Sequence, residues 1–196
     1  MKKTLGIIGV LVLIGIFLYQ FFVGFYNNGI EYQENAKTAW SDVESAYQRR
    51  ADLIPNLVET VKGYATHEKE TLEAVIKARA SATQTKIDPT NVTPEQMAKF
   101  QQAQQGLSGA LSRLLLTVER YPELKADKHF LELQSQLEST ENRINVSRDR
   151  FNEKVNIFNK HIKKFPGNLL AGWFGFSNMA RFESEKGAEK APKVKF

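Results

Sequence analysis

The sequence contains no cysteine. Disulfide bonds, thiolate metal sites and a lipid-modified cysteine are therefore excluded. Nowhere do lysine and arginine form the basic block of about five to eight residues that is typical of a nucleic-acid patch, and the net charge of +5 is modest. We therefore expect no nucleic-acid partner.

Alternating runs of β-branched residues, the pattern of β-strands, are also missing. The chain has no internal linker rich in Gly, Pro and Ser, and no repeat with a period of about 20 to 50 residues. The length that follows the apolar N-terminal segment suits one domain. We therefore expect an all-α protein with a single folded domain.

The residues that usually carry chemistry are sparse. None of the three histidines, His67, His129 and His161, has a partner at metal-ligand spacing. His67 and Glu68 begin like the zinc-protease pattern, but Thr71 stands where the second histidine is needed. No glycine-rich phosphate loop occurs, and Ser108 lacks the strand-turn-helix setting of a catalytic serine. The sequence predicts no enzyme, no metal and no cofactor.

An uncharged run from Thr4 to Ile30 follows Lys2 and Lys3 at the N-terminus. Its densest part, residues 5–26, would rise roughly 33 Å as a helix, enough to cross a hydrocarbon core of about 30 Å. We therefore predict that residues 1–30 form a single-pass membrane anchor with the lipid bilayer as partner. Its anchoring residues are Leu5, Ile8, Leu11, Ile14, Phe17, Phe21, Phe25 and Tyr26.

A cleaved signal peptide is the competing interpretation, but the run is longer than the usual 7 to 15 apolar residues and ends in bulky aromatics. The lysines on the short side and the acidic Glu31 and Glu34 beyond the run favour a cytoplasmic N-terminus. The expected location is a bacterial inner membrane, with the folded domain in the periplasm. The run has no GxxxG pair, so self-association would depend on the later helices.

Three long heptad seams follow, which predict an elongated antiparallel helical bundle or coiled coil of three to four long helices over residues 31–168. Pro55 should kink or divide the first helix, and a short joint is expected at residues 27–29. Residues 86–92 should be a loop, Thr93 and Asp127 should cap helices over 93–121 and 127–165, and Pro122 should separate them. The seam positions are Ala36, Trp40, Val43, Tyr47, Arg50, Ile54, Leu57, Val61 and Tyr64; Met97, Phe100, Gln104, Leu107, Leu111, Leu114, Val118 and Tyr121; and Phe130, Leu133, Leu137, Glu141, Ile144, Arg148, Phe151, Val155, Phe158, Ile162 and Phe165.

Four polar residues fall within these seams: Arg50, Gln104, Glu141 and Arg148. Burial of one charge alone is costly, so Glu141 should pair with Arg148 one heptad later, with Arg50 across the bundle, or with both. We interpret this buried polar seam as a device that sets helix register, with ligand binding as the alternative.

A second apolar segment, residues 169–182, is too short to span a membrane. It should pack on the bundle, on another protomer or on the membrane, through Leu170, Trp173, Phe174 and Phe176. Residues 183–196 mix Glu and Lys and are expected to form a disordered charged tail.

Several motifs together resemble the LemA family of bacterial membrane proteins. They are AWS at 39–41, RRADLIPNLVETVKGYATHE at 49–68, LSGALSRL at 107–114, ERYPELKA at 119–126, TENRI at 140–144 and FPGN at 165–168, followed by the Gly/Phe-rich segment that closes with Arg181 and Phe182. The resemblance covers nearly the whole chain; one departure is Phe151-Asn152, where the family commonly has Tyr-Asn.

The resemblance implies a helical bundle behind one membrane helix, no established enzymatic activity, and in some relatives a link to internal membrane compartments. We therefore expect a non-enzymatic scaffold or membrane-organising protein that forms a homo-oligomer. The alternative is a sensor or adaptor subunit that transmits a signal to another membrane protein.

Overall fold

The computed structural model describes residues 2–65, 67–90 and 92–183. Apart from Glu183, the expected tail lies outside these residues. The described chain is helical: α1 (Lys2–Tyr64), α2 (Lys69–Gln84), α3 (Pro94–Val118), α4 (Pro122–Lys125), α5 (Lys128–Lys163) and α6 (Gly167–Leu170). The all-α prediction is confirmed.

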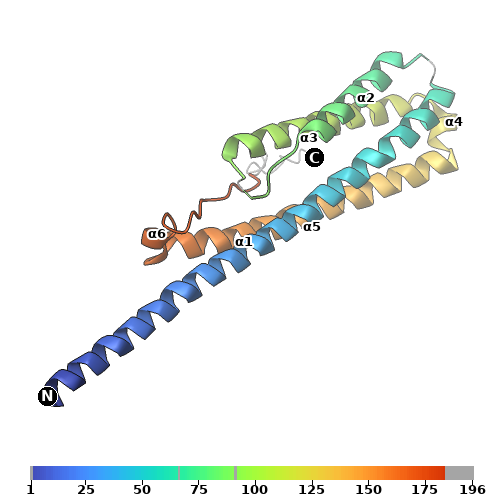
Figure 1. Cartoon of the computed structure of the whole chain (residues 1–196). Coiled ribbons are helices and arrows are strands. Elements are labelled where there is room, and N and C mark those ends of the chain that lie inside the picture. Colours follow the sequence, from blue (N-terminus) through green and yellow to red (C-terminus); the bar gives the residue numbers. More distant parts are fainter. Residues whose placement is uncertain (1, 66, 91, 184–196) are drawn as a thin grey trace, which may run out of the picture.

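The helices form an elongated bundle (Figure 1). α1 and α5 lie side by side along most of the length of α5, and α2 and α3 form a second pair that packs on α1. The first part of α1 extends beyond the other helices, with the N-terminus at its free end. The predicted bundle of long helices behind an N-terminal apolar helix is therefore present.

The heptad seams become the core. Trp40 is fully buried in the first seam, and its ring centroid lies 5.3 Å from that of Phe100 and 5.2 Å from that of Phe151. The seam prediction is wrong at Tyr64 and Phe165, which are both exposed. Each lies at or beyond the end of its helix, where the helical periodicity no longer points a side chain at the core.

The expected caps are present at both long helices. Thr93 and Gln96 form a capping box at the start of α3, with Pro94 in its first turn. At the start of α5 the backbone N–H of Phe130 donates to Asp127 Oδ1 over 2.8 Å, and this bond holds the pKa of the Asp127 carboxyl below its ordinary value. These side chains satisfy helix N–H groups that would otherwise lack partners.

The joint expected at residues 27–29 is wrong, and Pro55 does not divide the first helix, because α1 is continuous through both places. Gly29 meets a neighbour instead: a Cβ there would lie 2.5 Å from Cε2 of Phe176, so only glycine lets this ring pack on the helix. Helix α1 therefore carries the apolar N-terminal segment directly into the bundle.

A side chain of another helix replaces the backbone hydrogen bond that is missing at Pro55. Proline has no N–H, so the carbonyl of Ala51 loses its usual partner one turn later. The Nε of Arg79 on α2 donates to this carbonyl over 2.7 Å. The bond satisfies a buried acceptor and ties α2 to α1, which explains why α1 continues through the proline.

This repair leads to a testable prediction. Replacing Arg79→Met keeps much of the side-chain volume but leaves the Ala51 carbonyl unpaired, so the free energy of unfolding should fall by about 1–3 kcal/mol. In a Pro55→Ala background the backbone N–H of residue 55 is restored, and the same replacement should cost less than half as much. Denaturant unfolding in detergent, followed by circular dichroism, measures both; equal losses in the two backgrounds would contradict the assigned role.

Candidate functional site

The apolar start of α1 is the most exposed hydrophobic feature of the described chain. It is the one helix there that is long and apolar enough to cross a membrane, and its most apolar 18-residue window is not buried at all within the protein. Side chains exposed along it include Ile8, Leu11, Ile14, Phe17, Phe21 and Tyr26. Each fully buried side chain of this size is worth about 1.5–3 kcal/mol relative to water, so this surface requires an apolar environment.

Phe25 departs from the anchor prediction because it is buried in the protein. Its ring stacks on His161 with centroids 4.3 Å apart, and His161 Nε2 lies 3.0 Å from the Phe25 carbonyl oxygen. Gly167 provides space for the ring, since a Cβ there would come within 2.9 Å of Phe25 Cε2. The bundle therefore begins inside the predicted anchor, and the end of the apolar segment is clamped by α5 and α6.

Arg50 is the centre of the polar seam, with 4% of its surface exposed. Its Nη1 donates to Glu141 Oε2 over 2.9 Å and to Ser108 Oγ over 3.1 Å, while its Nη2 donates to Gln104 Oε1 over 2.7 Å. Gln104 Nε2 in turn donates to the carbonyl of Ala82 over 3.2 Å. One guanidinium therefore connects α1 with α3 and α5, and through Gln104 with α2.

The expected burial of the other two charged seam residues is wrong. The Glu141 side chain is 50% exposed, and Arg148 is only partly buried. Arg148 places its guanidinium 4.8 Å from the centroid of the Phe182 ring. Both side chains are long enough to leave the seam, so they reduce the desolvation cost that full burial of their charges would bring.

The predicted interaction segment divides into buried and exposed parts. Leu170 and Phe176 are buried, Phe174 is partly buried, and Trp173 is 80% exposed. Beyond Phe176 the chain runs back along the bundle as an extended segment, residues 176–183, which we call the strap (Figure 1). Phe182, near the end of the strap, packs against the core, and its ring centroid lies 5.9 Å from that of Trp40.

Two asparagines that the sequence reasoning did not single out hold the strap. Asn159 exchanges two hydrogen bonds with the backbone of Met179, over 2.8 and 3.0 Å. One heptad earlier, Asn152 does the same with Phe182, over 3.0 and 2.8 Å. The heptad spacing of two asparagines directly after the seam residues Phe151 and Phe158 was the available signal.

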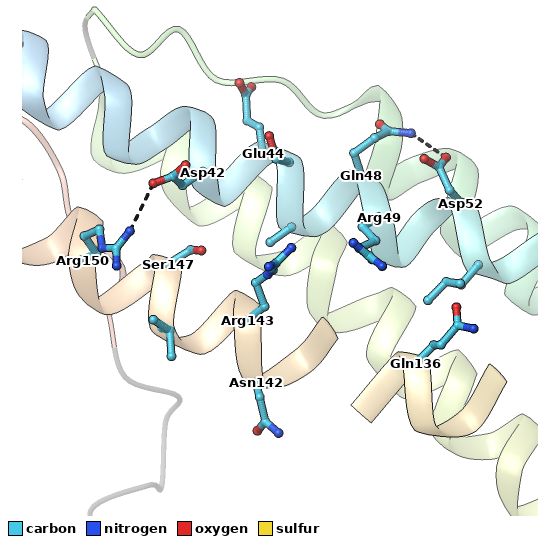
Figure 2. A pocket seen from close by; sticks show the side chains of 14 residues that line it. Asp42, Glu44, Gln48, Arg49, Asp52, Gln136, Asn142, Arg143, Ser147 and Arg150 are labelled. Atoms are coloured by element: carbon cyan, nitrogen blue, oxygen red, sulfur yellow. Dashed lines mark hydrogen bonds and ion pairs between the residues drawn. The ribbon is translucent and has the colours of Figure 1, made fainter. Parts of the chain in front are cut away.

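A groove of about 1250 Å³ lies between α1 and α5 (Figure 2). Its α1 side presents Asp42, Glu44 and Asp52 together with Arg49, and its α5 side presents Arg143 and Arg150. Asp42 and Arg150 form an ion pair at 3.5 Å across it. Among the described residues, no acidic side chain lies within ion-pair distance of Arg49 or Arg143. The sequence reasoning did not predict this charged groove, because its residues fall outside the seams.

Several known proteins are similar to this chain over most of its length. Protein LemA of Metamycoplasma hominis is 26% identical over 185 residues, which cover 94% of this chain and 80% of the relative. Magnetosome protein MamQ of Magnetospirillum gryphiswaldense is 28% identical over 184 residues, covering 85% of this chain and 67% of the relative. Magnetosome protein MamQ 1 of Paramagnetospirillum magneticum is 27% identical with the same coverage.

The model of the LemA family matches residues 39–196, most of the chain, including most of the bundle and the strap. Together with the resemblance in the motifs and the apolar helix before them, this match assigns the protein: it belongs to the LemA family.

Proposed function

We propose that this protein is a non-enzymatic scaffold that is anchored in a bacterial inner membrane and associates with further copies of itself. The observation that carries the proposal is the continuity of α1, which passes from an exposed apolar segment into the bundle core without a break. A helix shared by membrane and bundle holds the bundle in a defined position relative to the bilayer. That position suits organisation of a membrane surface better than the handling of a soluble substrate.

The polar centre supports a structural role. The buried guanidinium of Arg50 is engaged by side chains from two other helices. The space beside it measures about 40 Å³, well below the roughly 300–1,000 Å³ of typical small-molecule pockets. We therefore expect the hydrogen bonds of Arg50 to hold the helices in register rather than to bind a ligand.

The groove between α1 and α5 suits a second copy of this chain. Copies anchored by the same end in one bilayer stand parallel, so a twofold axis that relates them runs along their length. Two grooves facing each other about this axis bring α1 of one copy opposite α5 of the other. The α1 side, with three acids and one arginine, then faces the two arginines of α5, so the contact is complementary in charge.

The relatives support a role at membranes. Those from Magnetospirillum gryphiswaldense and Paramagnetospirillum magneticum are named magnetosome proteins, and the family resemblance implies that some members are linked to internal membrane compartments. We carry only the general role to this chain, namely organisation of a membrane surface by an assembled helical protein.

The proposal predicts the topology. Lys2 and Lys3 on the short side of the apolar segment favour a cytoplasmic N-terminus and a periplasmic bundle. Alkaline phosphatase fused after Phe196, which is active only outside the cytoplasm, should therefore be active in cells. A green fluorescent protein that matures only in the cytoplasm should stay dark at the same site; the opposite pattern would reverse the topology.

The groove contact predicts the effect of a charge reversal. Arg143 has no internal ion pair among the described residues, so Arg143→Glu should leave the bundle folded while it places a like charge opposite the acids of α1. We expect the dissociation constant of the detergent-extracted full-length protein to rise about tenfold or more, which corresponds to ~1.4 kcal/mol.

Light scattering over a dilution series measures this change. Arg113→Glu is the matched control, because Arg113 is exposed on α3 away from the groove and its reversal should leave the assembly unchanged. A wild-type protein that is monomeric at all concentrations would contradict the scaffold and favour the adaptor role instead.

A further inference from the structure

We infer that the end of the bundle nearest the apolar segment carries a second membrane-contacting surface, which rests in the bilayer interface beside α1. This surface, which we call the base, consists of Phe165, Leu169 and Trp173 together with Lys163 and Lys164. The inference rests on the membrane anchoring in the proposed function, and it does not depend on self-association.

The base is apolar and unusually exposed. Phe165 is 81% exposed and Trp173 80%, the two highest values for large apolar side chains in the described chain, and Leu169 is 61% exposed. They are spaced four residues apart, and helix-type hydrogen bonds join Asn168 N to Lys164 O and Ala171 N to Gly167 O between them. Phe165 follows the end of α5, Leu169 lies in α6 and Trp173 in the turn after it, so three exposed apolar side chains fall within one nine-residue stretch at this end of the bundle.

The position of the base is tied to the end of the apolar segment. Phe174, next to Trp173, lies with its ring 5.3 Å from that of Tyr26 and 6.0 Å from that of Phe25. Gly167, between Phe165 and Leu169, packs against Phe25. Phe25 and Tyr26 close the apolar run of α1, and Figure 1 shows α6 beside α1 where α1 leaves the bundle. The base therefore lies at the level where α1 leaves the hydrocarbon.

The composition of the base fits the bilayer interface. Tryptophan is enriched at this level because its ring is apolar while its N–H bonds to headgroups or water. Lys163 and Lys164 are exposed beside the apolar side chains and can reach anionic headgroups. Together with Phe21 and Tyr26 of α1, the base completes an aromatic belt around two elements of the protein. A second contact beside α1 would limit how far the bundle tilts.

The two tryptophans make the base testable in the full-length protein. Trp40 is fully buried, and it lies 14 residues beyond Tyr26 along α1, roughly 21 Å above the interface. In vesicles of phosphatidylcholine and phosphatidylglycerol, lipids brominated near the headgroup should quench the Trp173 fluorescence by about half or more. Aqueous acrylamide should quench it little. In the Trp173→Phe variant, which keeps only Trp40, neither brominated lipid nor acrylamide should quench the fluorescence appreciably.

Two variants define the role of the apolar side chains. The double change Phe165→Ser and Leu169→Ser should lower the quenching of Trp173 by brominated lipid at least twofold and raise its quenching by acrylamide. Leu116→Ser is the matched control, since Leu116 is similarly exposed on α3 but lies away from this end of the bundle. It should change neither measurement.

Two outcomes would contradict the proposed contact between the base and the membrane. Quenching of Trp173 by acrylamide but not by brominated lipid would place the surface in water, and protection from both would place it in a protein contact. Retention of the protein in the vesicle pellet after carbonate washing checks the anchoring separately. Loss from the pellet would contradict the proposed membrane anchoring, whereas retention with an unquenched Trp173 would contradict the base alone.

Discussion

The continuity of α1 is the constraint on which the rest of the structure depends. One helix must satisfy an apolar environment over its first part and a packed protein core over its second, with no flexible joint between them. The transition takes place within about one turn, where Phe25 is buried against His161 and Gly29 admits the ring of Phe176. Contacts from α5, α6 and the strap fix this turn. The orientation of the apolar segment therefore determines the orientation of the whole bundle.

The remainder of the fold keeps this long helix continuous and in register with its neighbours. Pro55 removes a backbone hydrogen bond from α1, and Arg79 on α2 supplies a replacement. Arg50 brings α3 and α5 to the same level of α1 through three side-chain partners. The strap closes the remaining side of the aromatic core around Trp40, held by the paired amides of Asn152 and Asn159. Each of these contacts joins elements far apart in the sequence.

The sequence predicts the parts of the structure that depend on local periodicity and local hydrogen bonding. Heptad spacing identifies Trp40, Phe100 and Phe151 as core residues, and the Thr93–Gln96 capping box marks the start of α3. Prediction from the sequence fails where contacts between distant elements determine the position of a side chain. Arg79 rescues the helix at Pro55 from another element, Phe25 is buried because α6 folds against it, and Glu141 reaches solvent from a seam position. The charged groove between α1 and α5 is also invisible to periodicity, because it depends on which faces of two paired helices remain uncovered.

A rigid connection between membrane segment and bundle is the central claim, and a single distance tests it most directly. The chain has no cysteine, so cysteines introduced at the exposed positions Tyr19 and Glu44 can be spin-labelled without background. If α1 is one helix in the bilayer, pulsed electron paramagnetic resonance on the labelled full-length protein, diluted with unlabelled protein in vesicles to remove distances between copies, should find one narrow distance of about 37 Å. A broad distribution, or one centred well below this value, would show a joint within α1 and contradict the claim.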